Sequence, residues 1–266
     1  MRLRVGGSGP LVVKVPGLAG GSGLYDEEVA RAREAGFRVA QLDPTGDRSD
    51  DPAAHPLSWD GLAAEVVEAL DRLGSDSAVL WGTSFGCLIS LAVAARQGQR
   101  VRGLLLCAPP RPGWRPPFHL WLLRLTERAR RPERATAAWF TAGFLLLNSW
   151  EFLNPAALVR LPGIVRAALD ARTPPRTVLD KLRLLLRDDP GLPDPRRAIP
   201  CSIISGSLDT VTLPGASLQL AELLPGARLR RLAFTGHSCA YARAGTFVRW
   251  SVEELRRLSG LAPTEP

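Results

Sequence analysis

The sequence has little cysteine and little histidine. Four cysteines occur among 266 residues, and no two of them have the C-x-x-C spacing of a zinc or redox motif. A chain of this length can bury a core without disulfides, so we expect the four thiols to be buried packing residues. The histidines are limited to His55, His119 and His237, which leaves three candidates for an imidazole base.

Long apolar runs are also absent. The segment 1–17 is interrupted by Gly, Pro and Lys14, so it lacks the continuous apolar stretch of a signal peptide, and we expect a cytoplasmic protein. The segment 135–150 contains no charged residue, but its sixteen residues fall short of the ~20 that span a bilayer. We therefore predict no transmembrane segment and interpret 135–150 as a helix that lines an apolar cleft. Weak interfacial contact with a membrane is the alternative.

Acidic residues are scarce in one part of the chain. From residue 111 to residue 198 there are sixteen Arg and Lys against eight Asp and Glu, whereas the rest has eighteen of each, so this segment carries the whole net charge of +8. A local positive field attracts an anionic substrate, an acidic carrier or an anionic surface, although a solvated arginine-rich face explains the excess equally well. No helix-turn-helix, zinc or RNA-binding signature accompanies it, so we predict no nucleic-acid partner.

Short apolar strands alternate with helices in two parts of the chain. The first part contains predicted strands at 11–15, 38–42, 78–81 and 101–108, separated by helices at 25–35, 58–73 and 84–97. The second part contains strands at 201–205 and 228–232 and helices at 214–224 and 241–258. Apolar strands that alternate with helices indicate an α/β fold, with a mostly parallel sheet covered by helices on both faces.

The segment between these two parts is helical and is broken by prolines. Its predicted helices lie at 118–130, 135–153, 156–171 and 177–187. We interpret residues 111–198 as a helical cap inserted into a core that comprises 1–110 and 199–266. The chain is therefore expected to form one sheet domain with one insertion.

A glycine-bracketed serine lies at a predicted strand-to-helix turn. Residues 82–86 read G-T-S-F-G, directly after the strand that ends at Trp81 and before the next helix. This is the G-x-S-x-G pattern of a nucleophile elbow, in which a tight turn exposes the serine hydroxyl at the carboxyl edge of the sheet. Ser84 is therefore the candidate nucleophile, and the helix N-terminus behind it favours negative charge at the reacting centre.

A serine nucleophile needs a base, and the base needs a carboxylate. His237 follows the last predicted strand and returns to the same sheet edge as Ser84, whereas His55 lies in an Asp- and Pro-rich loop and His119 in the cap. Asp209 follows the strand at 201–205 and reaches that edge as well. Ser84, Asp209 and His237 are thus the predicted nucleophile, orienting acid and base.

The order Ser, Asp, His and the elbow together resemble the α/β-hydrolase family over almost the whole chain outside the cap. The resemblance implies an oxyanion hole formed by two backbone N–H groups, at Phe85 and at Leu18 by motif position. Many family members read His-Gly in the early loop, where this chain has Pro16-Gly17. Serine rather than aspartate at the elbow argues against carbon–halogen or epoxide cleavage.

These features predict a serine hydrolase that cleaves a carboxylic ester or thioester through an acyl-enzyme, with no cofactor and no metal. The aromatic and leucine content of the cap suggests an apolar acyl group. The positive charge suggests an anionic group on that small-molecule substrate or an acidic carrier that delivers it. The same scaffold also supports lyase and acyltransferase chemistry. A non-catalytic ligand-binding protein is a further alternative.

Overall fold

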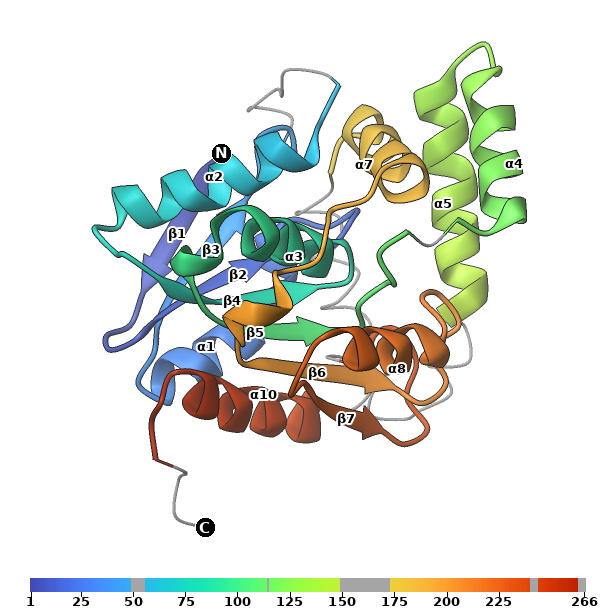
Figure 1. The fold of residues 1–266 in the computed structure, drawn as a ribbon. Helices are drawn as coiled ribbons and strands as arrows, with labels where there is room; N and C mark the ends of the chain where they lie inside the picture. The colour runs from blue at the N-terminus through green and yellow to red at the C-terminus, as the bar shows by residue number, and fades with distance from the viewer. Residues whose placement is uncertain (49–55, 114, 149–172, 240–243, 263–266) are drawn as a thin grey trace.

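The structure, a computed structural model, describes residues 1–48, 56–113, 115–148, 173–239 and 244–262. These residues contain a seven-stranded sheet in the order β1-β3-β2-β4-β5-β6-β7, with helices on both faces (Figure 1). Neighbouring strands from β2 onward are parallel, and β1 pairs antiparallel with β3. The predicted α/β class with a mostly parallel sheet is confirmed.

The strands occupy short segments rich in apolar and β-branched residues. Their bounds are β1 (Arg2–Gly6), β2 (Leu11–Val15), β3 (Arg38–Asp43), β4 (Ala78–Thr83), β5 (Val101–Cys107), β6 (Cys201–Gly206) and β7 (Arg228–Leu232). The six strands from β2 onward confirm the predicted positions to within two residues at each end. Strand β1 was not predicted, because it is a largely exposed edge strand without the apolar pattern that marks a buried one.

The helices that cover the sheet also follow the predicted positions. They are α1 (Asp26–Glu34), α2 (Trp59–Arg72), α3 (Phe85–Gln97), α8 (Pro214–Leu223) and α10 (Ala244–Leu258), and a short 3-10 helix, η1 (Ser22–Tyr25), precedes α1. The first residues of the last predicted helix, 241–243, lie outside the described part of the chain.

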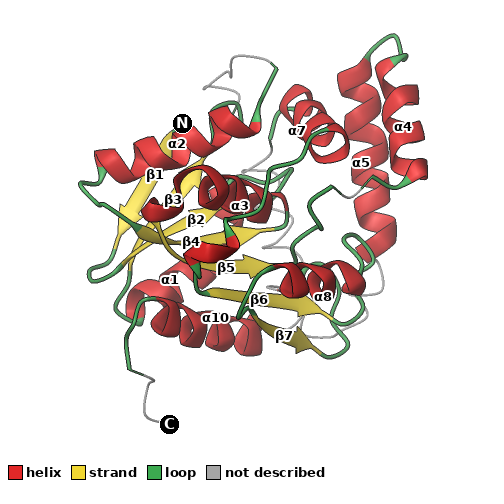
Figure 2. Ribbon diagram, viewed as in Figure 1, coloured by secondary structure: helices red, strands yellow, loops and turns green. Residues whose placement is uncertain are grey.

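The sheet separates two apolar layers, which Figure 2 shows as helices above and below the strands. One layer packs α2, α3 and α8 against the sheet, around buried side chains such as Leu70, Leu88 and Leu220. The other packs α1 and α10, around Val29 and Phe247. Because both faces are covered, the polar residues of the loops at the strand ends are the groups left to carry chemistry.

Three helices of the predicted cap are described, namely α4 (Pro117–Glu127), α5 (Pro132–Asn148) and α7 (Pro175–Arg187). A separate apolar cluster that includes Leu123, Leu179 and Leu182 joins them, and Glu127 of α4 pairs with Arg183 of α7 at 2.9 Å. Residues 149–172, which include the predicted helix at 156–171, lie outside the described residues. The division into a core and a cap therefore stays a prediction.

All four cysteine side chains are buried, and none of them is in a disulfide bond. Among the described helices, none combines the length and the apolarity that a membrane crossing requires.

Candidate active site

Ser84 lies at the turn between β4 and α3, in a strained backbone conformation. Its φ is 51° and its ψ is −117°, which is unfavourable for any residue with a side chain. The two flanking glycines are required by space. A Cβ at Gly82 would lie 2.6 Å from the carbonyl oxygen of Gly86, and a Cβ at Gly86 would lie 2.4 Å from that of Val15. The turn therefore exposes the serine hydroxyl because only glycine fits on either side of it.

The structure brings Ser84, His237 and Asp209 together from three separate loops. His237 Nε2 lies 3.1 Å from Ser84 Oγ, and His237 Nδ1 lies 2.9 Å from Asp209 Oδ2. The two gaps along the chain are 153 and 28 residues. Their meeting follows from the parallel sheet, since the loops after β4, β6 and β7 all leave its carboxyl edge.

Asp209 is held in place by four hydrogen bonds. Its Oδ1 accepts from the N–H groups of Val211 at 2.8 Å and Thr212 at 2.9 Å, and its Oδ2 accepts from the Thr212 hydroxyl at 2.7 Å as well as facing His237. Burial by itself would raise the pKa of this carboxyl. The nearby His237 and the donors of Thr212 outweigh burial, so the pKa of Asp209 is lowered and the group stays ionised.

The loops that carry the acid and the base are tied to each other. The N–H of Leu208 donates to the carbonyl oxygen of Thr235 at 2.9 Å, and the N–H of Phe234 donates to Ser207 Oγ at 2.9 Å. A Cβ at Gly206 would lie 2.2 Å from the Thr235 carbonyl oxygen, so the two backbones are in direct contact. This contact fixes the distance between Asp209 and His237.

The loop that contains Leu18 lies beside the elbow. A Cβ at Gly17 would be 3.6 Å from Ser84 Cβ, which places the loop next to the nucleophile. Phe85 is the first residue of α3, so its N–H is free of intrahelical bonds. Within the described residues, no hydrogen bond from the N–H of Leu18 or Phe85 to another protein group is found.

A buried ion pair lies beside the Phe85 ring. Lys181 of α7 and Asp47, in the loop after β3, are 2.5 Å apart, and their side chains are almost completely buried. The Lys181 ammonium is 5.5 Å from the centroid of the Phe85 ring, which also stacks on Trp59. This pair joins the loop after β3 to α7.

The other two histidines are not part of this arrangement. His119 lies in α4, where its ring meets the ring of Phe118 edge-on, and burial lowers its pKa. His55 lies outside the described residues.

Three polar residues beside the candidate site are not expected from the sequence patterns: Thr212, Tyr25, which accepts from the Gly17 N–H at 3.0 Å, and Lys14, which donates to Thr83 at 2.9 Å. Thr212 was missed although it lies three residues after Asp209, a spacing typical of a local side-chain turn. The sequence pattern predicts Tyr25 as the start of a helix and indicates Lys14 only as an interruption of an apolar segment. A lysine inside a β-branched strand was the available signal, because a central strand buries both faces.

The chain matches a protein-family model. The model described as alpha/beta hydrolase fold covers residues 10–241. The chain belongs to the α/β-hydrolase fold family.

Individual relatives of the chain differ in what their names describe. The chain is 31% identical to polyketide synthase ThaQ of Burkholderia thailandensis over 88% of its own length, but it spans only 11% of that synthase. It is 28% identical to the putative carbamate hydrolase RutD of Klebsiella pneumoniae, over 90% of this chain and 88% of that protein.

Solved structures share the α/β-hydrolase architecture over nearly the whole chain. An enol-lactonase from Burkholderia xenovorans superposes with a TM-score of 0.78, at 21% identity over 96% of this chain and 95% of that one. The esterase EaEST from Exiguobacterium antarcticum gives 0.76, at 19% identity over 96% and 94%. At such low identities the structural likeness shows the fold alone. Membership of the α/β-hydrolase fold family supports a hydrolase in general.

Proposed function

We propose that this α/β-hydrolase cleaves a carboxylic ester or thioester through an acyl-enzyme on Ser84. The observation that carries the proposal is the pair of short distances at His237, 3.1 Å to Ser84 Oγ and 2.9 Å to Asp209 Oδ2. A serine hydroxyl within hydrogen-bond reach of an imidazole, itself oriented by a buried carboxylate, is the arrangement that activates an acyl-transfer nucleophile.

In the first half-reaction, Ser84 Oγ attacks the acyl carbon while His237 Nε2 takes the hydroxyl proton. The bond to the leaving alcohol or thiol then breaks, and His237 returns the proton to the leaving group. In the second half-reaction, His237 activates a water molecule that displaces Ser84 from the acyl group. Asp209 stays ionised throughout and stabilises the imidazolium, in agreement with its lowered pKa. The reaction as proposed requires no metal or organic cofactor.

We assign the oxyanion hole to the N–H groups of Leu18 and Phe85. The proximity of Gly17 to Ser84 and the position of Phe85 at the start of α3 support this assignment. Each donor of such a hole contributes about 3 kcal/mol to transition-state stabilisation, so the spacing between the two donors matters as much as the three side chains.

An apolar acyl group is favoured by what surrounds the Leu18 loop. Leu18 and Ala19 pack against the apolar cluster of α4 and α7, together with Trp139 of α5. An acyl group that binds beside the Leu18 loop would therefore contact aliphatic and aromatic side chains.

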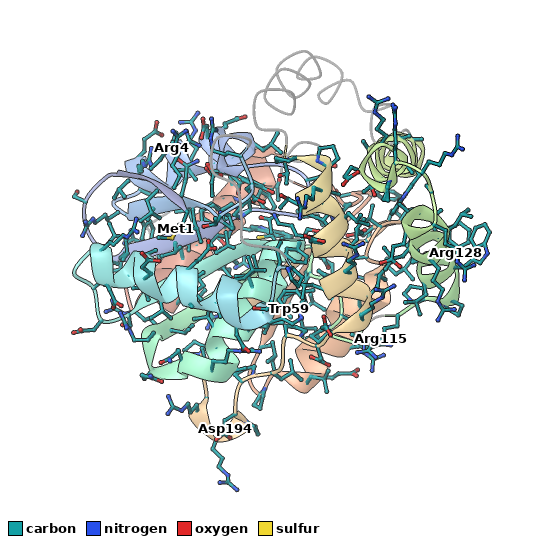
Figure 3. All side chains as sticks on the ribbon, turned by 90° about the horizontal axis from the view of Figure 1, so that it is seen from above. Met1, Arg4, Trp59, Arg115, Arg128 and Asp194 are labelled. Carbon is teal, nitrogen blue, oxygen red and sulfur yellow. The ribbon has the colours of Figure 1, made fainter. Side chains whose placement is uncertain are left out.

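The cap also carries positive charge that described carboxylates do not neutralise. Arg115, Arg124 and Arg128 are exposed, and Figure 3 labels Arg128 at the outer edge of the cap. No ion pair between Arg124 or Arg128 and a described carboxylate is found, whereas Arg183 and Arg187 both pair with Glu127. We propose that the small-molecule acyl donor is anionic or is delivered by an acidic carrier.

The first experiment measures p-nitrophenol release from acetate, butyrate and octanoate esters, together with labelling by a fluorophosphonate. Wild type should turn over and become labelled, and Ser84→Ala should do neither. Ser251→Ala is the matched control, because this buried hydroxyl of α10 has no hydrogen-bond partner among the described residues. A folded wild type that is not labelled would overturn the proposal in favour of a lyase or a ligand-binding role.

The second experiment tests the charge. Arg124→Gln/Arg128→Gln should lower kcat/KM for an anionic acyl donor about tenfold at low salt and leave a neutral donor unchanged. Arg31→Gln/Arg72→Gln removes the same charge from core helices α1 and α2 and serves as the control. Equal rates for both donors at every ionic strength would remove the electrostatic part of the proposal. Vesicle binding in place of a rate effect would assign the arginines to interfacial contact.

A further inference from the structure

The loop that contains Gly17 and Leu18 forms a hydrogen bond with a tyrosine hydroxyl. The N–H of Gly17 donates to Tyr25 Oη at 3.0 Å, in a buried position. A Cβ at Gly17 would lie 3.2 Å from that hydroxyl and 3.6 Å from Ser84 Cβ, so Gly17 is wedged between Tyr25 and the nucleophile. This hydrogen bond therefore sets how closely the loop approaches Ser84.

A completely buried lysine connects this tyrosine to the elbow. Lys14 of β2 donates to Thr83 Oγ1 at 2.9 Å and to Glu28 Oε2 of α1 at 3.1 Å. Its ammonium also lies 4.3 Å from the centroid of the Tyr25 ring and 4.0 Å from that of Trp81. Since Thr83 directly precedes Ser84, one side chain contacts both the anchor of the loop and the strand that ends in the elbow.

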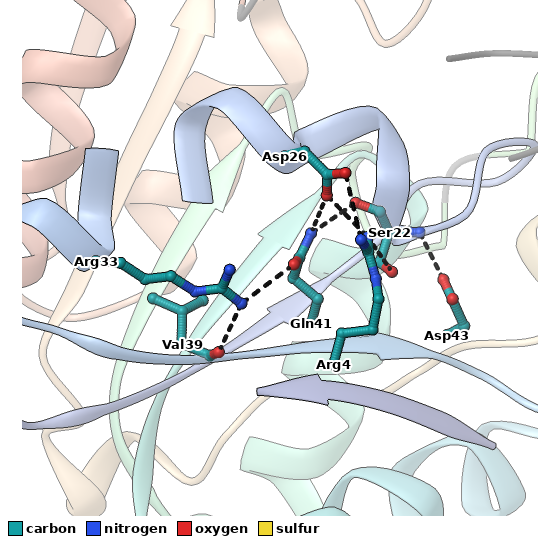
Figure 4. A network of polar contacts seen from close by, with 7 residues as sticks. All are labelled: Arg4, Ser22, Asp26, Arg33, Val39, Gln41 and Asp43. Carbon is teal, nitrogen blue, oxygen red and sulfur yellow. Dashed lines mark hydrogen bonds and ion pairs between the residues drawn. The ribbon is translucent and has the colours of Figure 1, made fainter. Parts of the chain in front are cut away.

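The short helix that contains Tyr25 is bound to strand β3. The short helix η1, which ends at Tyr25, is tied to β3 by Asp43, which accepts from the Ser22 N–H at 2.5 Å, and by Gln41, which donates to the Ser22 carbonyl at 3.0 Å. Figure 4 shows this network and its extension to Arg4, Asp26, Arg33 and Val39. These bonds hold the short helix that ends at Tyr25 against β3.

Stability alone does not account for the Lys14–Glu28 pair. The side chain of Lys14 is 0% exposed and that of Glu28 is 5% exposed. Burial raises the pKa of Glu28 in spite of the neighbouring ammonium. The desolvation of two buried charges commonly offsets their attraction, and an apolar pair of similar volume is often as stable. The Lys14–Glu28 pair, which joins β2 to α1, is better explained by the groups that its hydrogen bonds position.

We propose that Tyr25 and Lys14 are positioning residues for the oxyanion hole. Tyr25 holds the loop that carries the Leu18 N–H, Lys14 holds the elbow that carries the Phe85 N–H, and their contact keeps the two donors at a fixed spacing. The proposal rests on the proposed acyl-transfer function of Ser84. It also gives the Pro16-Gly17 loop an anchor contributed by η1.

The test compares variants that remove one contact at a time. Tyr25→Phe removes only the hydroxyl, Thr83→Val removes only the acceptor of Lys14, and Thr83→Ser retains that acceptor. Lys14→Met/Glu28→Met replaces the whole pair without leaving an unpaired charge. We expect Tyr25→Phe, Thr83→Val and the double variant to lower kcat on p-nitrophenyl butyrate about tenfold or more with KM unchanged. Thr83→Ser should stay close to wild type.

A second readout separates positioning from folding. Phenylboronic acid forms a tetrahedral adduct with a serine hydroxyl and places an oxygen in the oxyanion hole, so its Ki should rise in parallel with the loss in kcat. All rates are normalised to the sites that a fluorophosphonate labels at completion. Glu254→Gln is the control for a disturbed buried ion cluster. Glu254 accepts a hydrogen bond from Ser202 near the amino end of β6, whereas the candidate site lies at the carboxyl edge of the sheet. This variant should lower the melting temperature and leave kcat per labelled site unchanged.

The outcomes distinguish this inference from the function on which it rests. A folded wild type that is neither labelled nor active overturns both. An active wild type with Tyr25→Phe and the double variant at wild-type kcat per labelled site overturns the inference alone. A loss of kcat without any change in boronate affinity also overturns it.

Discussion

The substitution Asp209→Asn tests whether Asp209 orients the base, His237. Two backbone N–H groups, of Val211 and Thr212, point at Oδ1, so the amide oxygen of the introduced asparagine would take that position. The amide nitrogen would then occupy the Oδ2 position and donate a proton toward His237 Nδ1, 2.9 Å away in the wild type. His237 would have to accept at Nδ1 and carry its proton on Nε2. An imidazole in that tautomer cannot take the proton of Ser84.

The magnitude follows from the lost base. In serine hydrolases with this arrangement, the same change lowers kcat about 10⁴-fold, which corresponds to roughly 5.4 kcal/mol in the barrier. The assay is kcat for p-nitrophenyl butyrate, together with the rate constant of fluorophosphonate labelling, which needs the same proton transfer. Both should fall together while the far-ultraviolet circular dichroism stays unchanged.

Glu254→Gln provides the matched control, because it converts another buried carboxylate to an amide. Glu254 accepts from Ser202 near the start of β6, whereas Asp209 follows the other end of that strand. This variant should leave kcat unchanged. A kcat for Asp209→Asn within tenfold of wild type would refute the assignment of Asp209 as the orienting acid. The reasoning about the tautomer would also fail if labelling stayed fast while turnover was lost.

The stability of the protein should depend on pH, on the space around the elbow and on the buried charges. The pKa of Asp209 is lowered below its ordinary 3.8, so the ionised group stabilises the fold above about pH 4. This contribution should be lost as the pH falls through the folded pKa. Thermal unfolding of wild type and Asp209→Asn at pH 2–5 checks this. Burial raises the pKa of Asp47 to about 6, so stability should decline as the pH rises from 4 through 6, and Asp47→Asn should lack this decline. Gly86→Ala should cost about 3 kcal/mol in urea unfolding, because its Cβ would lie 2.4 Å from the Val15 carbonyl oxygen. Lys181→Met should cost about 3–5 kcal/mol by leaving Asp47 unpaired, and Asp47→Leu/Lys181→Met should recover most of it.

Local patterns were sufficient for most of the sheet domain. The apolar segments at 11–15 and 101–107 and the glycine-bracketed Ser84 are read within a few residues, because strand burial and turn sterics depend on near neighbours. The parallel arrangement then places the residues after β4, β6 and β7 at one edge. Strand β1 is not predicted, because it has no apolar pattern and its pairing with β3 joins residues 33 to 41 positions apart, from Gly6–Val39 to Arg2–Asp43.

The buried polar contacts beside the candidate site could not be predicted from local patterns. Lys14 meets Glu28 14 residues away and Thr83 69 residues away, and a lysine in an apolar strand can equally mark a strand end or a solvent-facing position. The partnership of Asp47 with Lys181 was missed for the same reason. A buried charge selects its partner by distance in space, and sequence patterns report only distance along the chain.

The α/β alternation, the elbow at Ser84 and the chain order of the three candidate side chains can be predicted from the sequence. Each of these depends on short-range sterics or on the burial of single strands and helices. The 3.1 Å and 2.9 Å contacts of His237, the hydrogen bond from Gly17 to Tyr25 and the burial of Lys14 are visible only in the folded protein. Those depend on how strands and helices distant in the chain pack together, because the free energies of buried polar contacts are set by atomic distances that only packing fixes.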